Sequence, residues 1–162
     1  MKNWVLMLFF FFWYPLSVQA LGLELPVVSG WQASPPQFLH YQGGFGKAFY
    51  IARTYTNGEA SIQVFLAGGP EGEKFSHLLS DRLEISTKDY YLKYIQDGPF
   101  RCLVSYTPPE KRGFMAVFLS KKPVVILFAR YQGLTDKELY QWLKGFDWEK
   151  LRQKSIAVLG NE

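Results

Sequence analysis

Two hairpin signals set within runs of alternating hydrophobicity constrain the fold of this chain more than any other feature. Asn57-Gly58 separates the β-rich runs 47–55 and 59–67, and both turn residues tolerate a positive φ. Asp97-Gly98 is a second signal of this kind, followed by alternating residues from Phe100 to Tyr106. Such alternation is typical of antiparallel strands that bury one face. These runs therefore predict an antiparallel sheet built from hairpins.

The other segments predict how this sheet is completed. Residues 113–120 and 123–131 are apolar on both faces, as expected of central strands, and 21–36 is extended, with an edge strand at Trp31. Gly68-Gly69-Pro70 ends one strand and begins an inserted helix. Thr135 and Glu138 have capping-box spacing ahead of a second, amphipathic helix. The fold class is α+β: an antiparallel sheet of about six to seven strands, with an inserted helix and a C-terminal amphipathic helix packed on it.

The first twenty residues have the three parts of a secretory signal peptide. Lys2 precedes an uncharged block at 4–14, and cleavage is expected between Ala20 and Leu21. The block is about eleven residues long, short of the roughly twenty that span a bilayer as a helix. We expect a signal peptide at 1–20, a single domain at 21–154 and a flexible tail at 155–162, in a periplasmic or secreted bacterial protein that meets the membrane only during export. An uncleaved anchor is the alternative.

Charge and cysteine content limit the classes of function. The chain has 18 basic and 14 acidic residues, and removal of Lys2 leaves a formal charge near +3. This excess is too weak and too dispersed to predict binding to nucleic acid. The single cysteine, Cys102, allows no internal disulfide, and its alternation with Phe100 and Val104 favours a buried, inert thiol over a nucleophile. We expect no cofactor.

Residues 37–46 are expected to form a glycine-rich loop. Its run Gly43-Gly44-Phe45-Gly46-Lys47 superficially resembles a phosphate-binding loop. That motif requires Gly and Ser or Thr where this chain has Tyr41 and Ala48, and it must open a helix rather than a strand. The run is instead expected to be a flexible loop able to contact a partner. His40 and His77 lack metal-ligand spacing and are expected at the surface.

Tyrosines and basic residues interleave near the second hairpin signal. Tyr91 and Lys93 belong to this stretch, and tyrosine provides contact area together with a polar tip. One interpretation is a recognition face for an anionic or sugar partner. The other is that aromatic residues simply favour strands. No catalytic residue and no metal ligand is predicted.

The linear plan resembles that of the Mog1/PsbP-like fold, which includes small exported proteobacterial proteins. The resemblance rests on Leu25-Pro26 with Gly30-Trp31, on the hairpin that joins 53–55 to 62–64, and on the strand 124–127 leading into 134–139. It covers most of the mature chain and carries no catalytic motif. Such domains are docking or assembly modules more often than enzymes, so the resemblance implies a non-catalytic role.

The expected function is therefore that of an exported binding or assembly module in the cell envelope, whose partner is an envelope protein or an anionic surface. Gly43, Gly44, Phe45, Lys47, Tyr91 and Lys93 are the candidate contact residues. The alternatives are a ligand-binding or enzymatic domain, with a groove between the sheet and the C-terminal helix, and the same domain tethered by an uncleaved N-terminus.

Overall fold

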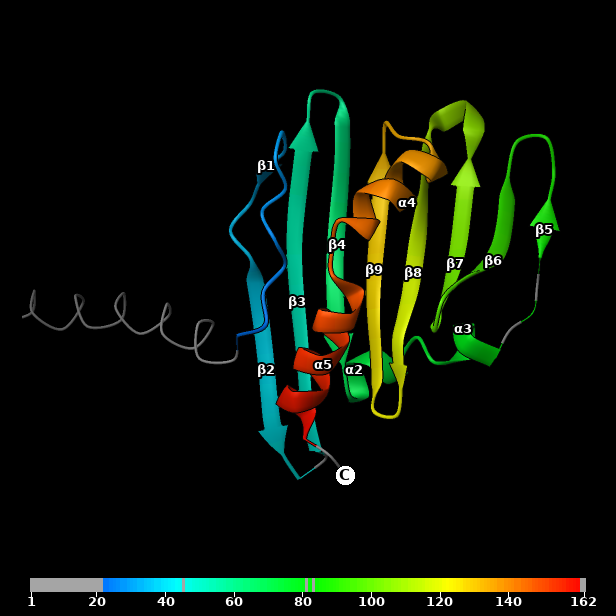
Figure 1. Cartoon of the computed structure of the whole chain (residues 1–162). Coiled ribbons are helices and arrows are strands. Elements are labelled where there is room, and N and C mark those ends of the chain that lie inside the picture. The colour runs from blue at the N-terminus through cyan, green and yellow to red at the C-terminus, as the bar shows by residue number, and fades with distance from the viewer. Residues whose placement is uncertain (1–21, 45, 81, 83, 161–162) are drawn as a thin grey trace, which may run out of the picture.

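The computed structural model describes residues 22–44, 46–80, 82 and 84–160 of the chain (Figure 1). The leader, its Ala20/Leu21 cleavage site, Phe45 and Leu83 lie outside the described residues. The described strands are β1 (Gln32–Ala33), β2 (Gln37–Gly43), β3 (Gly46–Asn57), β4 (Ala60–Gly68), β5 (Ile85–Ser86), β6 (Tyr91–Asp97), β7 (Phe100–Thr107), β8 (Arg112–Lys121) and β9 (Val124–Gln132). The described α-helices are α2 (Pro70–Glu73), α3 (His77–Ser80), α4 (Asp136–Lys144) and α5 (Trp148–Leu159).

These strands form one antiparallel sheet, so the fold is α+β as expected. The strand order is β1-β3-β4-β9-β8-β7-β6-β5, with β2 also paired to β3. β1 pairs with β3 at Tyr55 and Thr56, and β2 pairs with residues 46–52 of β3. Both therefore lie along the same edge of β3. The described sheet has nine strands rather than six or seven, because short pieces at its two edges also join the ladder.

Both hairpin predictions are confirmed. Asn57 pairs with Ala60 across the first turn, and Asp97 pairs with Phe100 across the second. Gly58 and Gly98 adopt φ values of 58° and 56°, which glycine reaches without steric cost. From β6 to β9 the chain forms a meander, as the run of alternating segments predicted.

The expectation of a loop at 37–46 is wrong. This segment forms β2, which pairs with β3 from Gln37↔Ala52 to Gly43↔Gly46. The β3–β4 ladder begins only at Phe49, so the tip of the β2–β3 hairpin extends past the end of β4. We call this hairpin end, residues 39–48 without Phe45, the arm. Its glycines had suggested a loop, but they lie at the turn of a long hairpin, where Gly46 has a φ of 97°.

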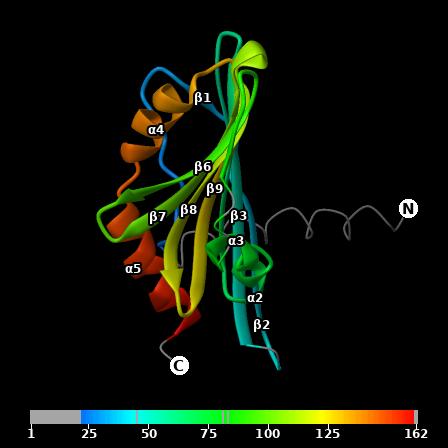
Figure 2. The ribbon, with the colours of Figure 1, turned by 90° about the vertical axis from the view of Figure 1, so that its right-hand side faces the viewer.

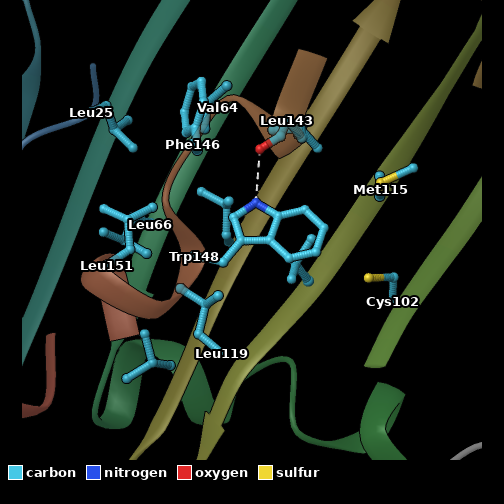
Figure 3. Packing of buried hydrophobic residues seen from close by; sticks show 14 of the residues in the cluster. Leu25, Val64, Leu66, Cys102, Met115, Leu119, Leu143, Phe146, Trp148 and Leu151 are labelled. Atoms are coloured by element: carbon cyan, nitrogen blue, oxygen red, sulfur yellow. Dashed lines mark hydrogen bonds between the residues drawn. The ribbon is translucent and has the colours of Figure 1, made fainter. Parts of the chain in front are cut away.

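One face of the sheet is covered by α4, α5 and the N-terminal segment (Figures 1 and 2). Leu23 and Leu25 are buried on this helix-covered face together with alternate residues from the long strands. Figure 3 shows Trp148 at the centre of this core, where its indole Nε1–H donates a 2.8 Å hydrogen bond to the Leu143 carbonyl. Most of the large buried side chains belong to this layer.

The C-terminal helices begin where capping residues predict. The Thr135 hydroxyl accepts from the Glu138 N–H while the Glu138 carboxylate accepts from the Thr135 N–H, which forms the expected capping box. Asp147 caps α5 through its side chain, which accepts from the Lys150 N–H. The expectation of a flexible tail from Ser155 is wrong for residues 155–159. Helix α5 continues to Leu159, and the side chains of Ser155 and Leu159 are both buried. Leu159 reaches the core because it lies on the same buried face of α5 as Trp148 and Leu151.

The opposite face, which we call the open face, is covered only at one end. α2 and α3 lie against it there, and no described helix covers the remainder (Figure 2). The single predicted helix after Pro70 is two short helices in the structure. Beneath them lies a smaller buried cluster around Leu103, Ala116 and Ile126. Half-buried Phe65, Phe114 and Phe128 continue from this cluster toward the uncovered end.

Candidate functional site

The predicted contact residues do not converge. Gly43 and Gly44 lie exposed at the tip of the arm, and Lys47 is half-buried beside it on β3. Tyr91 and Lys93 lie on β6, which β4, β9, β8 and β7 separate from β3 in the sheet. These residues therefore belong to two separate surfaces.

Tyr91 and Lys93 face α4 on the helix-covered face. The Lys93 ammonium is 3.6 Å from the Asp136 carboxylate and lies 4.7 Å from the centre of the Tyr91 ring. Burial, followed by a hydrogen bond to Asp136, raises the pKa of the Tyr91 phenol. The Tyr91 ring packs edge-on against Tyr106 at 5.6 Å. Tyr91 and Lys93 are therefore engaged in contacts within the protein, although the Lys93 side chain remains 44% exposed.

A shallow hollow lies beside this pair, between the sheet and α4. It has a volume of about 210 Å³, and its floor is formed by Ile95, Val104 and Met115. Lys93 and Asp136 stand at its rim. Its position is that of the predicted groove, but its size suits only a small apolar group.

Cys102 is fully buried, as its alternation with Phe100 and Val104 predicted. Burial raises the pKa of its thiol to about 12, so the thiolate is scarce at neutral pH. His40 lies exposed on β2 and His77 on α3, in separate elements. Among the residues that the structure describes, no three His, Cys, Asp or Glu side chains gather as a potential metal site.

The open face carries a site that the sequence interpretation missed. The strand register aligns ten side chains, all polar except Phe114, in two neighbouring rows across five strands. The first row is Thr54, Gln63, Arg130, Phe114 and Ser105, and the second is Thr56, Ser61, Gln132, Arg112 and Thr107. We call these ten residues the polar rows. Most of them border a hollow of about 630 Å³ that is wide and shallow.

The strands that form this surface carry basic but no acidic side chains. β2, β3, β4, β7, β8 and β9 contain no Asp or Glu. Arg112 pairs with Glu110, which lies on the 3-10 turn Pro108–Glu110 outside the strands. Arg130 is exposed, and the described residues offer it no hydrogen bond and no ion pair. The hollow therefore presents two guanidinium groups, of which only one has an acidic neighbour.

Arg130 escaped the sequence interpretation because its strand appeared apolar on both faces. β9 does bury both faces along most of its length, but its C-terminal end places Arg130 and Gln132 on the open face beyond α2 and α3. One sequence signal for this site was available. Polar residues recur near the ends of three strands: Ser61 and Gln63, Arg112, and Arg130 and Gln132. Only the register shows that they lie side by side.

Comparisons with known proteins add no assignment: no family model, no curated protein and no solved structure matches this chain. Among the described residues, no helix is long and apolar enough to cross a bilayer.

Proposed function

We propose that this chain is an exported, non-catalytic binding module that holds an acidic oligosaccharide of the cell envelope on its open face. The observation that carries the proposal is the polar rows: two arginines among hydroxyl and amide side chains, on five strands that contain no acidic residue. The expected anionic or sugar partner is retained, while its contact moves from Tyr91 and Lys93 to Arg112 and Arg130.

The types of side chain suit a sugar acid. A guanidinium group forms paired hydrogen bonds with a carboxylate. Gln63, Gln132 and the neighbouring hydroxyl groups can both donate and accept, which suits sugar hydroxyl groups. The half-buried ring of Phe114 offers an apolar platform for the C–H face of a sugar.

The spacing of the polar rows also suits an extended ligand. Directly opposed strand residues have Cβ atoms about 5 Å apart, and diagonal neighbours such as Arg112 and Arg130 are about 7–8 Å apart. Two guanidinium groups at this separation can reach one carboxylate together or two successive carboxylates along a chain. The hollow is wide and shallow, which suits a segment of a longer polymer.

The proposal is tested by calorimetric titration with oligogalacturonic acid and with a neutral galactose oligomer of equal length. We expect the acidic oligomer to bind and the neutral one to bind at least tenfold more weakly. Arg130→Gln removes one charge-assisted interaction and should weaken binding about tenfold or more. Lys150→Gln is the matched control, because Lys150 is exposed and lies on α5, which covers the other face of the sheet.

Three results would contradict the proposal. Equal binding of the two oligomers would remove the role of the arginines. If Lys150→Gln weakened binding of the acidic oligomer as much as Arg130→Gln, the effect would come from the net charge of the protein alone. A polyglutamate peptide of equal charge that binds as tightly as the sugar would indicate a protein partner instead.

Export and the Mog1/PsbP-like resemblance belong to the same proposal. The leader at 1–20 supports export, and the order of hairpin, short helices, meander and terminal helices supports the resemblance. N-terminal sequencing of the protein recovered outside the cytoplasm tests the first part. A chain that begins at Leu21 is expected, and one that retains Met1 would favour the tethered alternative.

A further inference from the structure

The outer edge of β2 is a second interaction surface, distinct from the polar rows. β2 pairs with β3 on one side, and no described strand pairs with its other side. Leu39 and Tyr41 are 58% and 48% exposed, and they belong with Val27 to the most exposed large apolar side chains described. A free edge therefore coincides with exposed apolar side chains on the same seven-residue strand.

Free edges are normally protected, and among the described residues β2 shows none of the usual protection. Proteins place lysine, proline, a bulge or a covering segment at an exposed strand edge to prevent pairing with another chain. β2 has the sequence QFLHYQG, without charge or proline, and its ladder with β3 has an unbroken register. This edge has the properties of a strand that pairs.

The edge is complementary to itself. Full antiparallel overlap of two copies of β2 is centred on His40, and it places Leu39 of each copy opposite Tyr41 of the other. Both residues point to the open face, because they oppose Tyr50 and Ala48 of β3. Each pair then combines an aliphatic with an aromatic side chain, a favourable cross-strand combination.

Charge does not oppose this arrangement. β2 carries no Asp, Glu, Lys or Arg, and the nearest such residue on β3, Lys47, is opposite Gln42 near the tip of the arm. Antiparallel pairing places the two tips at opposite ends of the interface, so the two Lys47 side chains stay apart. A mostly apolar hollow of about 200 Å³ beside Leu39 and Tyr41 offers further surface to cover. It is bordered by Pro70 and by Glu71, whose carboxylate pairs with Lys74.

We propose that two copies of this chain pair through β2, antiparallel and centred on His40, and form one continuous sheet across a two-fold axis. This assembly does not depend on the ligand of the open face. The axis is perpendicular to the sheet, as antiparallel pairing requires, so both open faces point the same way. A dimer of this form presents two sets of polar rows to one surface, which would raise the avidity for any repeating ligand.

Sedimentation equilibrium of the purified protein without its leader tests the pairing. The wild type should show a reversible monomer–dimer equilibrium. Leu39→Lys and Tyr41→Glu should each shift it toward monomer by at least tenfold in dissociation constant. The double variant L39K/Y41E should recover dimerisation, because the introduced lysine of one copy then faces the introduced glutamate of the other. Val27→Lys is the control, since exposed Val27 lies outside β2.

Circular dichroism verifies that each variant is folded before its mass is measured. A wild-type protein that is monomeric at all concentrations would overturn the proposal. A dimer that both single variants leave intact would place the interface elsewhere, and failure of the double variant to recover would exclude this register. None of these outcomes bears on oligosaccharide binding, which the calorimetric titration measures in the monomeric variants.

Discussion

Arg130 and Arg112 differ in how much of their charge is available. Glu110 neutralises part of the Arg112 charge, whereas the described residues offer Arg130 no ion pair. Both guanidinium groups are exposed, so binding a carboxylate costs little desolvation, but salt screens the interaction. At the residue scale, Arg130 is therefore expected to contribute more to ligand affinity than Arg112.

Cys102 provides a prediction about reactivity. Because burial raises its pKa to about 12, the folded protein should not react with Ellman's reagent at pH 8 within minutes. In guanidinium chloride the thiol regains its ordinary pKa, and one equivalent should react rapidly. Rapid reaction of the native protein would show that Cys102 is accessible to the reagent in the folded state.

Asp97 provides a prediction about stability and pH. Its carboxylate accepts hydrogen bonds of 2.6 Å from Lys144 and from the Tyr140 hydroxyl, which lower its pKa in the folded state. Because the pKa is lower folded than unfolded, the stabilisation is present above the unfolded pKa and is lost as the pH falls through the folded pKa. Asp97→Asn should therefore cost about 1 kcal/mol of unfolding free energy at pH 7.

Urea denaturation at pH 7 and near pH 2 measures this difference. The difference in unfolding free energy between wild type and Asp97→Asn should shrink at the lower pH, because protonation of the Asp97 carboxylate weakens its bonds to Lys144 and Tyr140. An exposed control, Asp89→Asn, should show no gap at either pH. A gap that stays constant with pH would mean that the carboxylate charge is not what Lys144 and Tyr140 recognise.

Single residues were predictable from sequence where local alternation decides their position. The burial of Cys102 follows from its neighbours at 100 and 104. The neighbours of Arg130 come from β4 and β8, and the β4 partner is distant in sequence, so nothing local aligns them. Tyr91 and Lys93 were placed on a strand correctly, but which face α4 covers depends on long-range packing.

The N-terminus of α4 is stabilised by the capping box of Thr135 and Glu138. Removing the Thr135 hydroxyl leaves the N–H of Glu138 without its acceptor, so Thr135→Ala should cost about 1 kcal/mol in chemical denaturation. Ser29→Ala, a change at an exposed residue outside the helices and strands, serves as the control. A Thr135→Ala variant as stable as the control would show that the cap contributes nothing to folding.

Elements were predictable where their signals are local. Asn-Gly and Asp-Gly turns, a capping box and a Gly-Pro pair each correspond to a boundary in the structure. β2 was missed because its apolar and polar residues do not alternate cleanly and glycines follow it, a pattern shared by loops. Its strand conformation comes from pairing with β3, which a local pattern does not encode.

The two faces of the sheet differ in role: one contains most of the core, and the other carries the proposed binding site. The helix-covered face contains most of the core and supplies stability. The open face, uncovered by described helices beyond α2 and α3, presents polar side chains on rigid strands (Figure 2). A site on paired strands needs little reordering when a ligand binds, which favours recognition of an extended polymer.

NMR can map the ligand contact and so test binding on the open face directly. Backbone amide shifts would be followed in the folded protein during titration with oligogalacturonic acid. We predict the largest changes at the polar rows, around Gln63, Phe114 and Arg130, with little change in α4 and α5. Changes centred on the hollow beside α4, or no changes at high oligomer concentration, would show that the open face does not bind this ligand.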